Sequence, residues 1–205
     1  FRDPRIAYHR NPRNLGMVQN WNLCIDRAET ELVTLLHADD RVLPEYAAIM
    51  LELAGRYPDA ACFFCEASII DAQGRPRFSL ADAVKRFFVP RGGEDVVLRG
   101  EASLRILMAG NFIMCPTLCL RRSVIGSRRF SERWRQVQDL DFTSRLLMDG
   151  ECLVGSRRVG YAYRRHPGNA TALQSESLLR FEEEFALFKE VGAQAHEIGW
   201  QRAAR

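Results

Sequence analysis

Apolar runs and amphipathic stretches alternate along the first third of the chain, which predicts strands and helices in turn. Residues 5–10 (RIAYHR) and 32–36 are typical of short strands, and the apolar run at 62–70 predicts a buried strand. Between them, apolar residues recur every three or four positions over 17–28 and 44–56, which predicts two helices with one packed face. The order β-α-β-α-β favours parallel strands joined by right-handed crossovers.

The second half of the chain alternates less regularly. Helices are predicted over 80–88, 101–108 and 138–148, and strands over 117–121, 151–154 and 159–165. A long amphipathic pattern at 173–198 predicts a final helix whose leucines and phenylalanines lie opposite an acidic face. Its apolar face covers the body of the domain, a second copy of the chain or a membrane surface. Amphipathicity alone leaves these alternatives open.

Length and composition set broad limits. The chain has 205 residues, of which 47% are hydrophobic, so it can bury the core of one large domain. No apolar stretch approaches the ~20 residues that cross a bilayer, and the first residues lack a signal-peptide pattern. The formal net charge is +3, and the basic residues are mostly arginines, whose planar fork suits phosphate. Because no aromatic-interleaved basic motif accompanies them, we expect a diphosphate or an anionic membrane surface rather than nucleic acid.

Six cysteines raise the question of a zinc site. Cys62 and Cys65 lie within a predicted buried strand, where residues three apart face opposite sides of the sheet. One zinc ion cannot easily take both, and the spacing of zinc knuckles normally occurs on turns. Reduced, buried thiols are therefore the expectation.

Two adjacent carboxylates, Asp39 and Asp40, follow the predicted strand at 32–36. In open α/β sheets, ligands lie beyond the carboxyl ends of the strands. Magnesium and manganese are commonly held by one or two carboxylates while they also take oxygens from a substrate diphosphate. A solvated turn that caps the helix beginning near Pro44 would have the same sequence, so the spacing alone leaves both interpretations open.

Another pair of acids, Asp139 and Asp141, begins the predicted helix at 138–148. Acidic residues in a first helical turn are favoured by the helix dipole, whatever their function. Two positions along a helix rotate a side chain to nearly the opposite side. Only one of the two carboxylates can therefore face a given pocket.

Five short motifs follow one another along the chain. They are Asn14-Leu15-Gly16 with Asn22, His37-Ala38-Asp39-Asp40 before Pro44, Gly110-Asn111 with Pro116 and 121–124, Gln138-Asp139-Leu140-Asp141, and Tyr163-Arg164-Arg165-His166-Pro167-Gly168-Asn169. Together they resemble the motifs of glycosyltransferase family 2, a group of GT-A enzymes, over nearly the whole chain. Each motif is weak alone, but the five in this order are fairly specific.

The resemblance implies an α/β, Rossmann-like GT-A fold: three layers, a mainly parallel sheet, a mixed C-terminal part and a long C-terminal amphipathic helix. In one domain, residues 1–76 would form the remaining nucleotide-sugar-binding half, 77–170 the acceptor-side half and 171–205 the C-terminal helix. The first residues resemble the family's third strand, so its first two strands have no counterpart. We expect either a fragment of a longer protein or a truncated paralogue.

The resemblance also implies an inverting, metal-dependent transfer of a sugar from a nucleotide-sugar donor to a hydroxyl of a saccharide or lipid-linked acceptor, in bacterial surface glycan or glycolipid synthesis. Asp139 would accept the proton of the acceptor hydroxyl. Mn²⁺ or Mg²⁺ would be held by Asp39, Asp40 and His166, although a histidine at a strand end is equally explained by hydrogen bonding. The donor or its diphosphate would contact Asn14, Gly16, Asn22, His37, Asp40, Arg164 and Arg165, and the acceptor would contact Asn111 and Gln138.

Several features depart from the family pattern or leave alternatives. His37 stands at the usual first aspartate of the metal motif, and Gln138 at the usual glutamate before the base. Strand alternation allows only one of Arg164 and Arg165 to point inward. A non-catalytic binding or assembly domain is the second hypothesis. The expected compartment is the cytoplasm, with peripheral contact at the inner membrane face and a homodimer left open.

Overall fold

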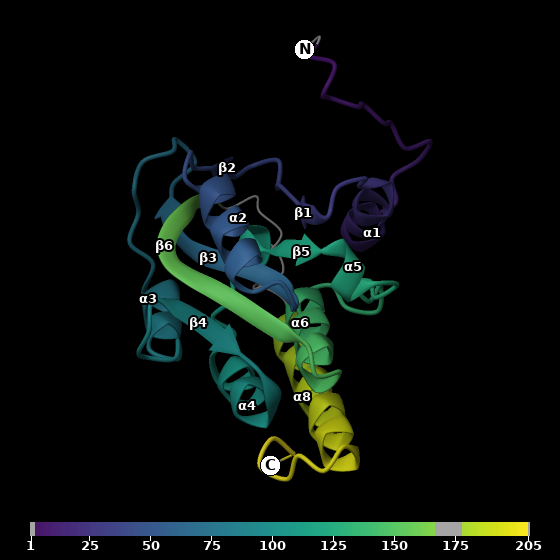
Figure 1. Ribbon diagram of the computed structural model, residues 1–205, viewed down its shortest axis with the longest axis vertical. Helices are drawn as coiled ribbons and strands as arrows, with labels where there is room; N and C mark the ends of the chain where they lie inside the picture. Colours follow the sequence, from purple (N-terminus) through teal and green to yellow (C-terminus); the bar gives the residue numbers. More distant parts are fainter. Residues whose placement is uncertain (1–2, 167–177, 205) are drawn as a thin grey trace.

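One curved, mixed sheet lies between two layers of helices in the computed structural model, which describes residues 3–166 and 178–204 (Figure 1). The strand order is β1 (Leu32–Thr34), β5 (Cys119–Arg121), β3 (Ala60–Ile70), β6 (Cys152–Arg164) and β2 (Arg41–Val42), with β4 (Asp95–Leu98) also paired to β6. The helices are α1 (Met17–Arg27), α2 (Tyr46–Arg56), α3 (Leu80–Arg86), α4 (Gly100–Gly110), α5 (Arg122–Ile125), α6 (Gln138–Met148) and α8 (Leu179–Glu197), with a 3₁₀ turn at Cys115–Thr117. The expected α/β class, with a long C-terminal helix, is confirmed.

The sheet is less parallel than the alternation of elements predicts. Strands β3 and β6 run parallel over their whole length, but β5 lies between β1 and β3 and is antiparallel to both. The expectation that the first strands pair as parallel neighbours is therefore wrong. Strand β5, from the second half of the chain, lies between β1 and β3. No local sequence pattern near residue 32 or 62 predicts this pairing.

The two faces of the sheet bury separate cores. Phe63 and Cys65 pack beneath α2, whereas Cys62 and Phe64 point to the other face, which α1, α4, α6 and α8 cover. The alternation along β3 thus separates Cys62 from Cys65, as predicted. All six cysteines are free thiols, and burial raises the pKa of Cys62 and Cys65, to about 12 for Cys65.

Most predicted helices are confirmed within a few residues, and α6 begins and ends where its pattern predicts. Strands predicted at 151–154 and 159–165 form one continuous strand, β6, because its pairing with β3 shifts register around Ser156–Val159 instead of ending there. The short elements β2, β4 and α5 were not predicted. Each is only two to four residues long, too short for a periodic signal.

The strand predicted at 5–10 does not form. Residues 3–16 run as coil away from the body of the molecule (Figure 1), with Ile6 57% and Tyr8 83% exposed. In the described chain no other strand lies beside them, and an alternating pattern without a partner strand cannot bury its apolar side.

The C-terminal helix α8 (Leu179–Glu197) buries a different face from the one that its sequence predicts. Along α8, Glu183, Leu187, Val191 and Ala195 are buried, whereas Phe181, Phe185 and Phe188 are exposed. Both carboxylate oxygens of Glu183 accept the backbone N–H of Arg135, and one also accepts that of Gln136. These hydrogen bonds compensate the cost of burying a carboxylate. Hydrophobic periodicity alone would place Glu183 on the exposed face of the helix. Residues 173–177 of the predicted helix lie outside the described residues.

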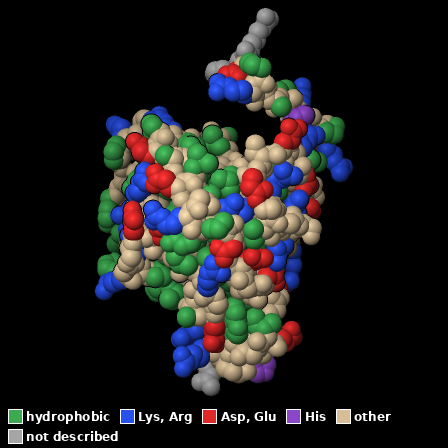
Figure 2. Space-filling model, in the orientation of Figure 1, with side chains coloured by type: hydrophobic (Ala, Val, Ile, Leu, Met, Phe, Trp, Pro, Cys, Tyr) green, Lys and Arg blue, Asp and Glu red, His purple; other side chains and the backbone are tan. Residues whose placement is uncertain are grey.

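Arginines gather at 121–135 and 157–165, and many of them pair with acids. Arg128 pairs with Asp149 at 2.7 Å, and Arg133 pairs with Glu190 at 2.5 Å. Figure 2 shows Lys and Arg side chains interspersed with Asp and Glu over the visible face. No helix in the described chain is both long and apolar enough to cross a membrane.

Candidate active site

Two adjoining cavities form a cleft between the turn after β1, the 3₁₀ turn, the start of α6 and the end of β6. Their volumes are about 550 and 600 Å³, and both are lined by Cys115, Pro116, Gln136, Asp139 and Tyr163. We call the first the α3-side cavity, since residues of α3 line it, and the second the β1-side cavity. Because they share a wall, a ligand with two parts can occupy both.

Asp39 lines the β1-side cavity from the turn that follows β1. Its side chain is 40% exposed, and its Oδ2 lies 3.2 Å from Nε2 of His166, which lines the α3-side cavity. Strand β6 carries His166 to this place from far along the sequence. The structure therefore brings together two of the three predicted metal ligands.

Asp40 points the other way. Its side chain is fully buried, Oδ1 accepts the backbone N–H of Arg164 at 2.8 Å, and Oδ2 accepts the hydroxyl of Tyr161 at 3.2 Å. Burial raises the pKa of Asp40 to about 6, although the bond from Arg164 opposes that shift. Asp40 lines neither cavity and instead ties the turn to β6.

The geometry of the predicted metal site therefore brings Asp39 and His166 together but places Asp40 elsewhere. Among the described residues, no three His, Cys, Asp or Glu side chains converge as a metal-binding group. An exposed carboxylate beside an imidazole, Asp39 with His166, still fits a cation that completes its shell with diphosphate oxygens and water. Metal binding stays a prediction, and Asp40 is placed as a structural anchor rather than in the cleft.

The two arginines at the end of β6 divide as strand alternation requires. Arg164 donates to the carbonyl of Asp39 at 2.6 Å and to that of Asp71 at 2.8 Å. Arg165 lines the α3-side cavity and makes two bonds to the carboxylate of Asp82, at 3.0 and 2.8 Å. Arg164 thus clamps two turns, and Arg165 is the one that faces the cleft.

Asp139 lies in the first turn of α6 and lines both cavities. Its Oδ1 accepts the N–H of Leu140 at 2.9 Å, and burial raises the pKa of its carboxyl, while the positive charge of Lys85 opposes the rise. Asp141 lines neither cavity and is held by Arg145 at 2.8 Å. The helix thus presents one of its two acids to the cleft.

His37 lines the β1-side cavity and stacks on Trp21 of α1, with ring centroids 5.2 Å apart and an interplanar angle of 17°. Burial lowers the pKa of His37, and the nearby Asp39 charge only partly opposes this. A neutral, stacked imidazole therefore stands at this position. The helical spacing over 17–28 places Trp21 on the packed face, and nothing in that spacing marks a residue that lines a site.

Three predicted donor contacts lie outside the cleft. The side-chain oxygen of Asn14 accepts the N–H of Gly16, which has a φ of 77° and directly precedes α1. Asn22 exchanges two hydrogen bonds with the backbone of Phe130. None of the three lines either cavity. Their geometry orders the start of α1 and joins it to the loop before α6.

The predicted acceptor-side residues do line the cleft. Asn111, with a φ of 37°, ends α4 and lines the α3-side cavity. Gln138 lines the β1-side cavity, and its buried Oε1 has no hydrogen-bond partner among the described residues. Lys85 of α3 and Arg180 of α8 line the α3-side cavity as well. Neither was predicted, because a helical pattern does not show which polar residues line a site.

Comparison with known proteins gives the class of protein. The model of the family described as glycosyl transferase family 2 matches residues 1–126, so the chain belongs to this family. No curated protein matches it in sequence.

Two solved structures share the fold. A crystal structure of S. aureus TarS 1–349 in complex with UDP is 13% identical, with a TM-score of 0.55 over 86% of this chain and 44% of that one. A crystal structure of S. aureus TarS is 14% identical, with a TM-score of 0.56 over 86% of this chain and 27% of that one. The chain thus spans less than half the length of either neighbour, and at these identities the likeness shows the GT-A fold alone.

Proposed function

We propose that this chain carries the catalytic cleft of an inverting glycosyltransferase that moves a sugar from a nucleotide-diphosphate sugar to a hydroxyl acceptor. Surface glycan or glycolipid synthesis is the proposed pathway, in the cytoplasm. The observation that carries the proposal is that Asp39 and Asp139, far apart in the sequence, line one cavity. A single in-line displacement needs a base for the acceptor hydroxyl and stabilisation of the leaving diphosphate, and one carboxylate on each side fits these two roles.

Asp139 is the proposed general base. It faces the cleft from the first turn of a well-buried helix, which fixes its position. Burial raises the pKa of its carboxyl, which makes the carboxylate a stronger base. Lys85 favours the ionised form, and only that form can accept the proton of the acceptor hydroxyl.

Asp39 and His166 are the proposed ligands of Mn²⁺ or Mg²⁺. When bound, the cation would stabilise the charge that develops on the leaving diphosphate. Asp40 supports this pair from below, since it holds Arg164 and Tyr161 of β6 against the turn that carries Asp39. One structural neighbour was crystallised with UDP, a nucleoside diphosphate of the kind this reaction would release.

The test is to incubate the full natural chain with manganese or magnesium and a panel of nucleotide sugars, and to measure release of nucleoside diphosphate and sugar transfer. We expect metal-dependent activity that Asp139→Asn removes. If wild type and Asp139→Asn are equally inactive towards every donor, the proposal fails.

A non-catalytic binding or assembly domain is the competing hypothesis, and it predicts no metal-dependent affinity for nucleotides. Calorimetric titration of the chain with a nucleoside diphosphate and manganese separates the two. Appreciable heat that Asp39→Asn abolishes supports the enzyme, and absence of heat supports the binding domain.

A further inference from the structure

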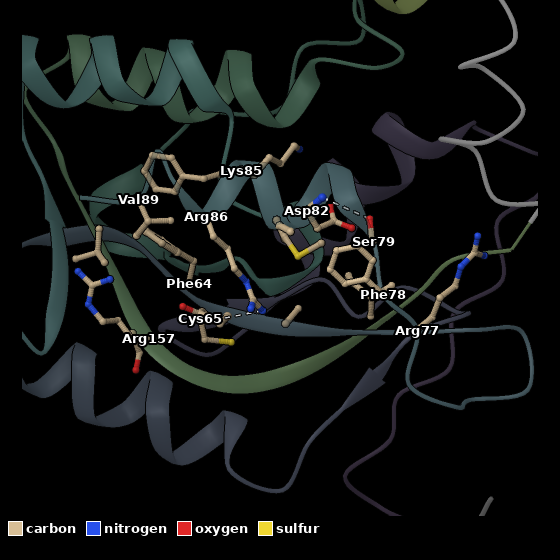
Figure 3. Close-up of a pocket in the computed structure, with 18 residues that line it drawn as sticks. Phe64, Cys65, Arg77, Phe78, Ser79, Asp82, Lys85, Arg86, Val89 and Arg157 are labelled. Carbon is tan, nitrogen blue, oxygen red and sulfur yellow. Dashed lines mark hydrogen bonds and ion pairs between the residues drawn. The ribbon is translucent and has the colours of Figure 1, made fainter. Parts of the chain in front are cut away.

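A third cavity lies between α3 and the sheet, and we call it the α3 pocket (Figure 3). Its volume is about 180 Å³. Phe64 of β3, Val96 of β4 and Phe112 form one wall, and Phe78 and Val89, on either side of α3, belong to the other. Gly155 of β6 leaves room for the ring of Phe64, because a Cβ there would lie 2.2 Å from it.

The α3 pocket stays open because α3 does not pack onto the sheet. None of the residues of α3 is buried, whereas protein interiors are ordinarily close-packed. Ion pairs hold the helix over the sheet instead: Asp82 with Arg165 at 2.8 Å and Arg86 with Glu66 at 3.5 Å. An apolar space kept open in this way is the usual form of a small-molecule site.

The α3 pocket is continuous with the cleft. Arg77, Asp82, Lys85 and Met114 line both the α3 pocket and the α3-side cavity, which also contains Asp139. A molecule that presents a hydroxyl to Asp139 can therefore extend its remaining part beneath α3. The donor side of the cleft does not share these residues.

The chemistry of the walls selects an apolar group. Of the charged groups that line the pocket, Arg77, Asp82 and Lys85 lie at its junction with the α3-side cavity, which they also line. The others are already engaged within the protein: Arg86 pairs with Glu66, and Arg157 donates to the carbonyls of Gly92 and Gly93. A saccharide placed here would lose hydrogen bonds to water without replacement, which is unfavourable. A cavity of about 150 Å³ holds one benzene ring, so about 180 Å³ suits a group of roughly six carbons.

We propose that the α3 pocket is an acceptor subsite that takes an apolar aglycone, an alkyl chain or a ring attached to the acceptor sugar. The assignment rests on the proposed function, because it places the acceptor hydroxyl at Asp139. It narrows the acceptor to a conjugate with an apolar part directly next to the sugar. Free oligosaccharides would leave the pocket empty.

Alkyl β-glucosides of increasing chain length, below their micelle-forming concentrations, test the proposal by calorimetry on the full natural chain. Each methylene added from methyl to hexyl should tighten binding about four-fold, and the gain should stop beyond roughly six carbons, where the pocket is full. The affinities of phenyl glucoside and hexyl glucoside show whether the pocket binds a ring or an alkyl chain more tightly. Affinity that is independent of chain length, or that rises without a plateau through octyl, overturns the proposal.

A filling substitution gives the matched control. Ala83→Leu places three extra carbons in the pocket wall, and Val84→Leu adds one on the same helix at a residue that does not line the pocket. Ala83→Leu should remove most of the gain between methyl and hexyl, and Val84→Leu should keep it. Equal slopes in the two variants overturn the proposal.

Binding of a nucleoside diphosphate with manganese is measured on the same variants. If it is retained while the chain-length dependence is absent, the aglycone subsite fails and the proposed function stands. If the dependence is present without nucleotide binding, the pocket binds apolar groups, but the proposed function fails and the acceptor assignment fails with it.

Discussion

Helices α6 and α3 both line the α3-side cavity, yet they are built in opposite ways. Eight residues of α6 are buried, among them Leu140, Leu146 and Leu147, whereas α3 buries none. The first helix is part of the core, and the second is attached mainly by ion pairs at its surface.

The difference follows the demands on each helix. Asp139 must hold its position to within a fraction of an ångström if it acts as a base, and a packed helix fixes a side chain more precisely than a loop does. A helix that covers a substrate pocket benefits from weak attachment, because local opening then requires little free energy. Substitutions in the two helices and at the cleft test whether this difference is real.

Replacing the acid at the start of α6 should have the largest effect. Asp139→Asn keeps the size of the side chain but cannot accept a proton, so we expect kcat to fall about 10²- to 10⁴-fold. Asp141→Asn, two positions away and outside the cleft, is the control and should keep most of the activity. Steady-state kinetics with the preferred donor measures both, and a smaller loss for Asp139→Asn than for Asp141→Asn would contradict the assignment.

Two leucine truncations compare the helices directly. Leu146→Ala removes a side chain that is 0% exposed, and we expect a loss of about 2–5 kcal/mol in the free energy of unfolding. Leu80→Ala on α3 removes one that is 68% exposed and should change it by less than about 0.5 kcal/mol. Urea denaturation of both variants checks this, and similar losses would show that α3 is as well packed as α6.

Asp40 should make stability depend on pH. Its folded-state pKa, about 6, lies above the ordinary value of 3.8, so the folded protein binds this proton more tightly than the unfolded chain. The resulting stabilisation is complete below pH 3.8 and is lost as pH rises through about 6, by on the order of 3 kcal/mol.

Asp40→Asn keeps the acceptor for the N–H of Arg164 but has no proton to lose. The variant should therefore gain stability relative to wild type between pH 4.5 and pH 7.5, when both are unfolded in urea at each pH. An unchanged difference between variant and wild type across that range would show that Asp40 is ionised as easily as an exposed carboxyl.

The smallest expected effect concerns the attachment of α3. Asp82→Asn weakens the ion pair with Arg165, so amide hydrogen exchange should accelerate several-fold within α3 and stay unchanged within α6. The midpoint of thermal unfolding should move little, because a partly exposed ion pair contributes at most about 1 kcal/mol. Asp82→Glu retains the charge and is the control, and equal exchange in all three proteins would exclude the ion pair as the attachment.

Local signals account for what was predicted well. The bounds of α6 follow from its acidic first turn and its leucine spacing, and the rotation that separates Asp139 from Asp141 is a property of any helix. The opposite facing of Cys62 and Cys65 follows in the same way from strand alternation. Each of these inferences needs only neighbours within a few residues.

Partners distant in the sequence account for the errors. A strand at 5–10 needed a neighbour that the described chain does not supply, and β5 entered the sheet between β1 and β3. The buried face of α8 was misjudged because Glu183 is compensated by backbone N–H groups some 47 positions earlier. Asp39 and Asp40 were both expected at the metal site, because two adjacent acids cannot be told apart until their distant partners on and after β6 are known.

The family, the main helices and long strands, and the residue types suited to a transfer can all be recognised from the sequence, because they depend on periodicity and short motifs. Which of those residues meet becomes visible only in the folded protein. In the fold, Asp39 faces His166 and the cleft, Asp40 is buried against Tyr161, and a space remains beneath α3. Such choices depend on the order of strands in the sheet and on packing between distant elements, which no local pattern contains.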